Sequence, residues 1–523
     1  MLFRGFNMAN RLFIIEAPGK EAILGRILYQ VFRQRCEIIA TVGHICENPK
    51  SLDMPWINDD LTEHAYHIKP ERHRLIDKLR LAARVADEIY IATDDDHEGD
   101  VIARDVFSNA LDSSEHNKLY RVKLRAMTIE EVRRAVADRE VYFPDANKGD
   151  ARRILDRLIG RLSNPKGAVG RVQGSMLIEL SSNNPVVGVA QLQIPAQDGG
   201  SPFCSNLPIF AGDEFDFEEI NHLCKQHQIA PGRVIETTSS STWNHSDILL
   251  NCSLSTGRPL TSIAEAMQRL YEKGQMTYPR SSQRTVSSHS ICKTQIIAKM
   301  QGVNFRPELV SNTRAASSSG HEAPSIIESD LPLHRRVDES TDTETAVKIL
   351  IARNQVESGM PCKITFGEPS SIAVLPEALK NLQWVRRDVP GLCLWLGDKE
   401  PSLKLWTKEQ SLIHFMQQTQ LGRPSTIIVH IDKFLSRELV NDDFSFTNKG
   451  NVWLNNHKEI FHNKNISNII EQYLDANNDL PSEMVMALLD VCQLDVSNSV
   501  GINRPDRQEI QENCEHEFTT LFN

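Results

Sequence analysis

Three carboxylates at alternate positions, Asp94, Asp96 and Glu98, form a pattern that can bind a metal ion. They follow an apolar stretch at 88–93 that is typical of a strand, and alternate side chains of an extended chain point to the same side. Such oxygen ligands suit Mg²⁺, which keeps several waters and needs only one or two protein carboxylates. Taken alone, the pattern is equally well explained as a solvated acidic loop. Its place at a strand end, with Gly99 and a helix following, favours the metal site.

Glu16 and Lys20 extend this prediction. Glu16 closes an apolar strand at 12–16, and Lys20 stands about one helical turn further on. If this strand and the one at 88–93 belong to one parallel sheet, their carboxyl ends meet at the same edge. A carboxylate, a cation and a metal site at one edge suit proton transfer and phosphate chemistry. We therefore group Glu16 with the candidate metal ligands and both residues with the candidate catalytic ones.

A row of arginines is the second feature. Arginines recur every four residues in a predicted helix at 151–162, opposite its apolar stripe, and the segment 170–173 adds another arginine and a glutamine. An ordinary solvated helix face is the better explanation for the row alone. However, residues 120–172 hold thirteen Lys or Arg against seven Asp or Glu, which favours a track for a phosphate backbone. The candidate contacts are Arg153, Arg157, Arg161, Arg171 and Gln173.

A tyrosine and an arginine lie together in the segment 277–280. The segment follows a predicted helix with a capping box at 262–265 and a terminating Gly274. The phenol of Tyr278 can attack phosphorus, and Arg280 can neutralise the oxygens of the pentavalent phosphate. A tyrosine in such an isolated segment is more often a packing residue.

Two further segments can bind phosphate. His321 can supply a donor held by the carboxylate of Glu322, although an isolated histidine is more often structural. The segment 422–426 opens an apolar helix with a cap, where backbone amides and side chains can hold phosphate. Its candidate residues are Arg423, Ser425 and Thr426. The chain contains no G-x-x-x-x-G-K-[ST] segment and thus no ATP-binding loop of that kind.

Strands and helices alternate over the first 110 residues, which predicts a parallel sheet with functional loops at the carboxyl ends of its strands. The predicted strands are 12–16, 36–45 and 88–93, and the predicted helices are 21–35, 72–86 and 101–111. Beyond about residue 198, Ser/Thr/Asn-rich strands and loops are expected. The Ser/Ala stretch at 315–319 is predicted to be an exposed loop, and the Asn-rich region 448–477 and the tail after 500 to be loosely structured.

Composition narrows the class of protein. The 523 residues allow roughly three to five domains. There is neither an apolar run of about 18 residues nor the apolar core of a signal peptide. Ten cysteines without a C-x-x-C pair argue against a zinc ribbon and a secreted disulfide framework, and favour a reduced cytoplasm. A net charge of −11 is unusual for a nucleic-acid-binding protein, but the local charge decides where contact is made.

Taken together, the motifs occur in the order, and at roughly the spacing, of those of the type IA DNA topoisomerases, which the chain resembles. The matching segments are 14–20, 92–100, 151–160, 170–173, 270–274, 277–280, 321–323 and 421–426. The lack of a cysteine-rich tail is similar to the topoisomerase III-like branch without zinc. The chain departs from the family pattern at Asp100, which replaces a second Glu, and at Ser282, which replaces an acidic residue. Residues 324–326 also lack the usual Arg.

The resemblance implies a multidomain α/β plus α and β fold, in which a Toprim α/β domain, helical domains and a β-rich arch form a torus. The implied boundaries are a Toprim domain at 1–145, helical DNA-binding segments at 146–200 and 401–500, a β-rich arch at 201–255 and 336–400, a helical domain with the catalytic tyrosine at 256–335, and a polar tail at 501–523.

The resemblance also implies a mechanism. Tyr278 attacks a phosphodiester of single-stranded or negatively supercoiled DNA and holds the 5′ end, while Lys20 or Glu16 protonates the 3′ oxygen. Arg280 and His321 stabilise the phosphate, Mg²⁺ is the cofactor, and ATP is not needed. A monomeric, cytoplasmic protein of bacterial or mobile-element origin is expected. Two alternatives stay open: a Toprim nuclease or primase, which has no need of the segments 277–280 and 422–426, and a catalytically silent DNA-binding relative.

Overall fold

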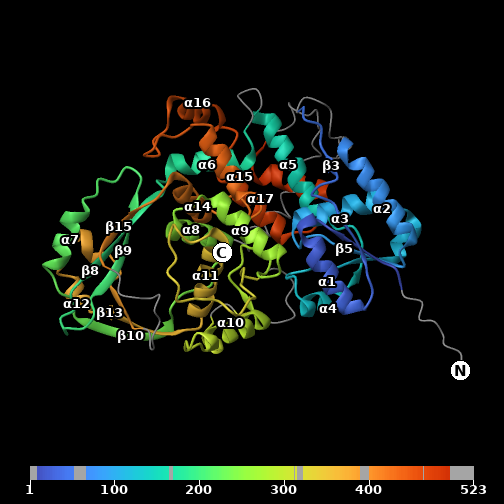
Figure 1. Cartoon of the computed structure of the whole chain (residues 1–523). Helices are drawn as coiled ribbons and strands as arrows, with labels where there is room; N and C mark the ends of the chain where they lie inside the picture. The colour runs from blue at the N-terminus through green and yellow to red at the C-terminus, as the bar shows by residue number, and fades with distance from the viewer. Residues whose placement is uncertain are drawn as a thin grey trace. The chain divides into compact units, whose positions relative to one another are not determined.

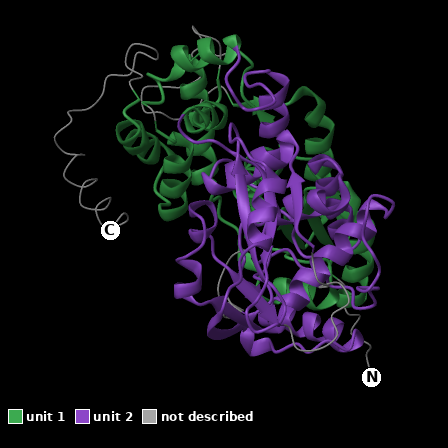
Figure 2. Ribbon diagram, turned by 90° about the vertical axis from the view of Figure 1, so that its left-hand side faces the viewer, with its two compact units in different colours: residues 1–181, 448–523 green, residues 182–447 purple. Residues whose placement is uncertain are grey.

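The computed structural model describes residues 9–51, 66–163, 169–310, 313–314, 322–388, 400–462 and 464–494. The chain divides into two compact units: unit 1 is 1–181 with 448–523, and unit 2 is 182–447 (Figure 2). His321, the Ser/Ala stretch at 315–319 and the tail after 500 lie outside the described residues. Within the described part of the chain, no helix is both long and apolar enough to cross a membrane.

Unit 1 contains the predicted parallel sheet. Its strand order is β2 (Glu37–Ala40), β1 (Arg11–Ile15), β5 (Glu88–Ala92), β6 (Leu119–Arg121) and β7 (Glu140–Val141), and only the edge pair β6–β7 is antiparallel. The helices that follow these strands are α1 (Glu21–Phe32), α2 (His73–Val85), α3 (His97–Ala110) and α4 (Ile129–Ala137). In the contacts between helices, α1 packs against α4, and α2 packs against α3 (Figure 1).

The central strand β1 is buried on both faces, as its unbroken apolar sequence requires. Phe13 stacks on Tyr90 of β5, with the ring centroids 4.5 Å apart, and lies beside Phe32 of α1. Leu12 and Ile14 belong instead to the core that contains the buried residues of α2 and α3. This two-sided burial fixes the register of β1 and therefore the place where the chain leaves the sheet.

Three predicted boundaries in unit 1 are corrected. The strand predicted at 36–45 is interrupted because Val42 and Gly43 have positive φ angles of 57° and 83°; the chain resumes as β3 (Cys46–Glu47), which pairs with β4 (His67–Ile68). The helix predicted to end at residue 35 ends at Phe32, because Arg33 is left-handed. The helix predicted from residue 101 is α3, which begins four residues earlier, at His97.

The Asn-rich region 448–477 is not loosely structured, so that prediction is wrong. It forms α16 (Asn448–His457) and α17 (Ile466–Ala476), followed by α18 (Pro481–Val491). Ile466, Ile470 and Leu474 recur every four residues and are fully buried. Helices α17 and α18 pack on α5 (Asn147–Ser163), and α6 (Arg171–Ser182) belongs to the same unit up to its last residue. One asparagine acts as a cap, since the side chain of Asn465 accepts from the amide of Asn468.

Unit 2 contains a six-stranded sheet and a group of helices (Figure 1). The strand order is β10 (Pro231–Thr238), β13 (Pro361–Gly367), β14 (Val385–Asp388), β9 (Phe203–Phe210), β8 (Val186–Ile194) and β15 (Ser402–Leu405). All five strand pairs are antiparallel. Strand β8 lies in the range 146–200 that was predicted to be helical. Its burial alternates residue by residue, which is typical of a strand with one covered face.

The helices of unit 2 include the one that precedes the tyrosine segment. They are α7 (Phe217–Lys225), α8 (His245–Thr256), α9 (Leu260–Glu272), α10 (Ser288–Met300), α11 (Thr343–Glu357), α12 (Pro369–Ile372), α13 (Glu377–Lys380), α14 (Lys408–Gln418) and α15 (Ile427–Ser436), with a short strand pair β11 (Val286–Ser287) and β12 (Thr313–Arg314). Helix α9 begins at Leu260 after Pro259, so the capping box predicted at 262–265 does not start it. The predicted end is confirmed, because Gly274 has a φ of 69°.

Candidate active site

The acidic edge of unit 1 lies where β1 and β5 end. The two strands are parallel, with Ile15 opposite Ala92, so the chain leaves both at the same edge and Glu16 and Asp94 follow there. Lys20 ends a short 3₁₀ turn, Pro18–Lys20, and its ammonium makes an ion pair with the carboxylate of Asp94. Both side chains are buried, with Lys20 2% and Asp94 7% exposed. Because an unpaired charge is costly to bury, each of these two groups makes the burial of the other possible.

The acidic loop after β5 is held by hydrogen bonds between side chains and its backbone. The carboxylate of Asp96 accepts a hydrogen bond from the amide of Gly99 at 2.8 Å and so caps α3, and the hydroxyl of Thr93 donates to the carbonyl of Gly99 at 2.8 Å. A Cβ at Gly99 would lie 2.0 Å from the carbonyl oxygen of Asp94, so only glycine fits there. Arg121 donates to the carbonyl oxygens of Thr93 and Asp94, each at 2.9 Å. The loop thus has little freedom to move.

Two other carboxylates of the acidic run form ion pairs. Asp100 contacts Arg121 at 3.2 Å, and Asp95 contacts Lys123 at 2.8 Å. Burial raises the pKa of Asp100, while Arg121 opposes this shift. Asp100, which departs from the family pattern, therefore helps to hold Arg121 against the loop.

The donor set at this edge fits an ion that keeps most of its waters. Among the described residues, no three His, Cys, Asp or Glu side chains lie together as a ready-made set of metal ligands. Asp94 is paired with Lys20, and one oxygen of Asp96 caps α3. The described residues therefore form no closed cage of protein ligands. Mg²⁺ does not need one, because it is usually held by one or two carboxylates and several waters.

An ion network connects the first turn of α3 to α5, α6 and α17. Arg152 lies 3.0 Å from Nδ1 of His97 and makes a bidentate contact with Glu471 of α17 at 2.9 and 3.0 Å. Arg171 contacts the same carboxylate at 2.8 Å and Asp156 at 2.8 Å. The sequence pattern did not point to Glu471, because it lies in the region predicted to be loose and 319 residues from Arg152.

This network corrects the position predicted for two candidate DNA contacts. Arg171 is 4% exposed, and Gln173 is also buried, so neither lies on the surface in this structure. Charge alone suggested a phosphate contact for Arg171. Its guanidinium instead neutralises two carboxylates inside unit 1.

The three candidate DNA-binding arginines of α5 are half-buried, and two of them have contacts with other parts of unit 1 that are described next. Arg153 pairs with Asp150 at 2.9 Å and lies over the ring of Tyr66, 3.8 Å from its centroid. Arg157 donates to the carbonyl oxygens of Pro49 and Ser51 at 2.8 and 3.0 Å. The third, at position 161, is half-buried as well. The helical period places the row opposite the apolar stripe, but it cannot reveal which distant segments cover that face.

The tyrosine segment of unit 2 pairs with a second short segment. The amide of Thr277 donates to the carbonyl of Ser325 at 2.8 Å, and the amide of Ser325 donates to the hydroxyl of Thr277 at 2.8 Å. A further bond joins Ile327 to Gln275 at 2.9 Å. Ser325 lies in the range 324–326 that departs from the family pattern, and it is buried as a partner of the tyrosine segment.

Tyr278 itself is 3% exposed. Its ring meets that of Tyr271 edge to face, with the centroids 5.7 Å apart. Arg280 is half-buried. The tyrosine is therefore buried in this structure.

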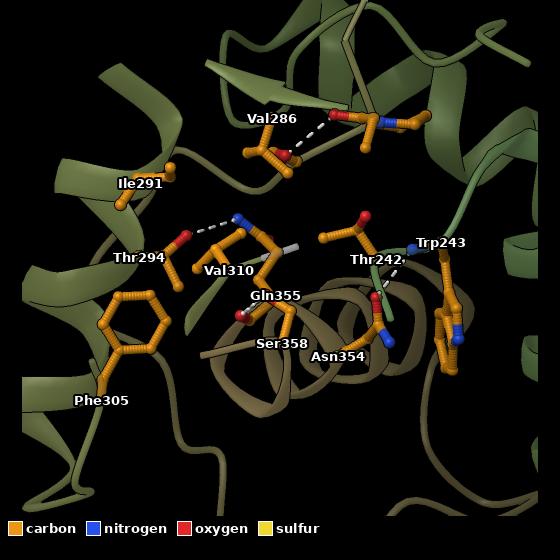
Figure 3. Close-up of a pocket in the computed structure, with 13 residues that line it drawn as sticks. Thr242, Trp243, Val286, Ile291, Thr294, Phe305, Val310, Asn354, Gln355 and Ser358 are labelled. Carbon is orange, nitrogen blue, oxygen red and sulfur yellow. Dashed lines mark hydrogen bonds between the residues drawn. The ribbon is translucent and has the colours of Figure 1, made fainter. Parts of the chain in front are cut away.

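A small cavity lies next to this segment (Figure 3). Among its lining residues are Ser325, Gln355 and Thr294. The side chain of Gln355 accepts from the amide of Ile326 at 2.7 Å and lies 3.2 Å from the hydroxyl of Thr294. Helix α11, which carries Gln355, thus holds the segment that pairs with Thr277.

The remaining predicted phosphate-binding segments are placed as follows. Glu322, expected to hold His321, accepts from the amide of Ser287 at 2.9 Å and from the hydroxyl of Ser290 at 2.8 Å, at the start of α10. In the segment 422–426, the carbonyl of Arg423 accepts from the amides of Thr426 and Ile427. The cap predicted for α15 is not formed, because the side chain of Thr426 makes no capping hydrogen bond. The candidates Arg423, Ser425 and Thr426 are half-buried.

Residues 11–127 match the Toprim domain family. The whole chain is similar to the full-length topoisomerase I of Thermotoga maritima, with a TM-score of 0.58 at 17% identity over 98% of this chain and 90% of the other. The chain has the fold of a topoisomerase I.

Relatives in sequence agree with this fold. The chain is 32% identical over 179 residues to DNA topoisomerase 1 of Campylobacter jejuni, covering 32% of this chain and 25% of that protein. It is 24% identical over 370 residues to the plasmid DNA topoisomerase I of Xylella fastidiosa, covering 64% of this chain and 52% of that protein. The chain therefore spans a quarter to about half of these relatives. The resemblance to type IA topoisomerases and the mixed α/β fold class are confirmed.

The Toprim domain includes the whole acidic edge. Glu16, Lys20, Asp94, Asp96 and Glu98 all lie between residues 11 and 127. Domains of this family generally bind Mg²⁺, which agrees with the chemistry of the donors at this edge. Tyr278, by contrast, belongs to unit 2.

Proposed function

We propose that this chain is an ATP-independent type IA DNA topoisomerase that cuts and rejoins one DNA strand through Tyr278. The observation that carries the proposal is the ion pair of Lys20 with Asp94 at the paired ends of β1 and β5, where Glu16 also follows the strand, inside a domain that matches the Toprim family. The presence of a tyrosine in the segment 277–280, in a chain with a topoisomerase I fold, supplies the nucleophile.

The proposed reaction is an exchange of phosphate esters. The phenolic oxygen of Tyr278 attacks the phosphorus and loses its proton to solvent, while the bond from phosphorus to the 3′ oxygen breaks. The leaving 3′ oxygen takes a proton from Lys20 or Glu16, and the 5′ end stays on the tyrosine. Because one phosphodiester replaces another, resealing by the reverse step needs no ATP. Another strand passes through the gap before resealing, which relaxes negative supercoils or separates linked DNA.

The other groups stabilise charge. Arg280 and His321 are proposed to neutralise the transferring phosphate. The carboxylates of Asp94, Asp96 and Glu98, with Glu16, would hold Mg²⁺. When bound, the ion would stabilise the negative charge of the pentavalent phosphate.

DNA contacts are proposed for the half-buried polar residues of α5 and of the segment 422–426. These are Arg153, Arg157, Arg161, Arg423, Ser425 and Thr426. Arg171 and Gln173, which are buried, would act by holding α6 in place. We expect the protein to be a monomer. It should prefer single-stranded or negatively supercoiled DNA, because a tyrosine that attacks one strand needs that strand to be unpaired.

The test is denaturant trapping of a covalent adduct on labelled single-stranded DNA, with relaxation of a negatively supercoiled plasmid, both with Mg²⁺ and no nucleotide. Tyr278→Phe removes only the attacking oxygen, so it should fold and bind DNA but form no adduct. Tyr271→Phe is the matched control. It removes the hydroxyl of the neighbouring buried ring, which takes no part in the proposed reaction, so cleavage should be intact.

Two outcomes would contradict the proposal. If the chain is a Toprim nuclease, it will release free DNA ends, and the Tyr278→Phe variant will cut as well as the wild type. A silent DNA-binding protein would give no adduct in either form.

A further inference from the structure

The segment that follows Tyr278 has no regular secondary structure, so its backbone groups need partners from elsewhere. Four of its carbonyl oxygens, at positions 279, 281, 282 and 284, accept hydrogen bonds from one short stretch of unit 2. That stretch is the start of α8 and the turn before it. We call the four residues Thr242, Asn244, His245 and Asp247 the α8 clamp.

The contacts of the clamp follow the tyrosine segment in order. His245 uses two groups: its Nδ1 bonds to the carbonyl of Pro279 at 2.9 Å, and its backbone amide donates to the carbonyl of Ser281 at 2.9 Å. The two bonds therefore lie on either side of Arg280.

Three further contacts of the clamp reach the tyrosine segment as far as residue 284. Asn244 donates through its side chain to the carbonyl of Ser282 at 3.3 Å. The hydroxyl of Thr242 donates to the carbonyl of Arg284, and the guanidinium of Arg284 pairs with Asp247 at 2.8 Å.

The clamp is itself rigid. Asn244 and Asp247 form a capping box, in which each side chain accepts from the other residue's amide at 3.0 and 2.9 Å. The amide of Trp243 donates to the side chain of Asn354 at 2.9 Å, which ties the turn to α11 (Figure 3). Helix α11 also carries Gln355, which holds the segment paired with Thr277. The tyrosine segment is thus held on both sides by groups that contact one helix.

The imidazole of His245 is neutral in this arrangement. Facing a carbonyl, Nδ1 must carry the hydrogen, which leaves Nε2 as a bare acceptor. In the described part of the chain, Nε2 is buried without a hydrogen-bond partner. Burial lowers the pKa of His245 to about 4; the carbonyl of Pro279 opposes this shift, and the charge of Arg280 adds to it. A second proton would have no hydrogen-bond partner among the described residues, and the charge of Arg280 would oppose it.

We propose that the α8 clamp positions Tyr278 and Arg280 for attack on the phosphate, with His245 as its central positioning residue. The inference rests on the proposed function. His245 touches no reacting atom; it fixes the peptide groups on either side of Arg280, the first of which belongs to Pro279, the residue directly after Tyr278. Because reacting groups must be aligned closely, a shift of about 1 Å in such a segment can slow the chemical step roughly 10²-fold.

The test compares two replacements of His245 that differ in one donor. His245→Asn keeps an N–H near the position of Nδ1 and should still reach the carbonyl of Pro279. His245→Leu keeps the bulk but removes that donor. The matched control is His457→Leu in unit 1, where another buried histidine bonds through Nδ1 to a backbone carbonyl, that of Trp453, at 2.8 Å.

The rate of adduct formation is measured in single turnovers on saturating labelled single-stranded DNA, with DNA affinity and thermal unfolding measured alongside. His245→Asn should cleave at close to the wild-type rate. His245→Leu should cleave roughly 10²-fold more slowly with unchanged affinity. His457→Leu should lower the unfolding temperature without this loss of rate.

A second variant covers the case in which His245→Leu does not fold. Asn244→Asp keeps the helix cap, because aspartate caps as well as asparagine, but cannot donate to Ser282. It should also slow adduct formation. Wild-type rates in every folded clamp variant, or equal losses in His245→Asn and His245→Leu, would overturn the proposal.

Failure of the proposed function is recognised separately. If the wild-type protein forms no adduct, hydrogen–deuterium exchange of peptides covering 276–284 still tests the clamp. Exchange should be faster in His245→Leu than in wild type and His245→Asn, and equal exchange would refute the clamp.

Discussion

The acidic edge and the tyrosine segment are positioned by different physical means. The acidic edge lies at the ends of two hydrogen-bonded parallel strands and is held by charge pairs such as Lys20–Asp94. The tyrosine segment lies in irregular chain between α9 and α10 and is held by hydrogen bonds between neutral groups, to which Arg284 adds one ion pair with Asp247. The first region should therefore be sensitive to loss of charge, and the second to loss of single donors or acceptors.

The largest effect is expected from breaking the buried ion pair. Lys20→Met removes the ammonium partner of Asp94, and leaving a buried charge in this way costs about 3–5 kcal/mol of unfolding free energy. Urea unfolding measures the loss, and the double variant Lys20→Met/Asp94→Leu should recover most of it. The control is Lys123→Met, since Lys123 is half-exposed and its pair with Asp95 is worth about 1 kcal/mol or less. Equal losses in the two single variants would show that charge does not hold this edge.

A smaller effect is expected from acid at the tyrosine segment. His245 has a folded pKa of about 4, below the ordinary value of 6.5, so the unfolded chain binds its proton first as the pH falls. Stability from this group is complete above pH 6.5 and is lost between 6.5 and 4, at about 1.4 kcal/mol per pH unit. The difference in unfolding free energy between wild type and His245→Asn should shrink with this slope, because asparagine does not titrate. A constant difference over that range would mean that the histidine is not buried in its neutral form.

The smallest effect is expected at Thr277. Thr277→Val keeps the shape but removes the oxygen that accepts from the buried amide of Ser325, at a cost of about 1 kcal/mol. Thr277→Ser keeps this oxygen and should be closer to wild type. Chemical denaturation of both variants measures the difference. If valine and serine were equally tolerated, hydrogen bonding would not be what holds the tyrosine segment.

The acidic edge was predictable because its signals are local. A strand, three alternating carboxylates and a following helix stand in one stretch, and the parallel pairing of β1 with β5 brings Glu16 and Lys20 to them. The region around α17 was misjudged because its asparagines suggested a loose chain, although Ile466 and Ile470 keep a helical spacing. Local charge likewise could not reveal that Arg171 is buried against Glu471.

The tyrosine motif was visible in the sequence, but the groups that hold it were not. His245 bonds to a backbone carbonyl, and every residue offers such a carbonyl, so no pattern of side chains marks the contact. The same holds for Ser325, whose carbonyl accepts from the amide of Thr277, and for Gln355, whose side chain accepts from the amide of Ile326. The position of His321 lies outside the described residues, and its role stays a prediction.

The discontinuous make-up of unit 1 has a consequence during synthesis on the ribosome. Arg152 emerges early, but its partner Glu471 follows 319 residues later. At typical translation speeds of about 5–20 residues per second, this delay is roughly 15–60 s. During that time the nascent α5 exposes the apolar face that α17 and α18 will cover, while unit 2, which is continuous in sequence, can fold ahead of it. The C-terminal helices thus complete unit 1 last, and chaperones that shield apolar surface have their longest opportunity to bind at α5.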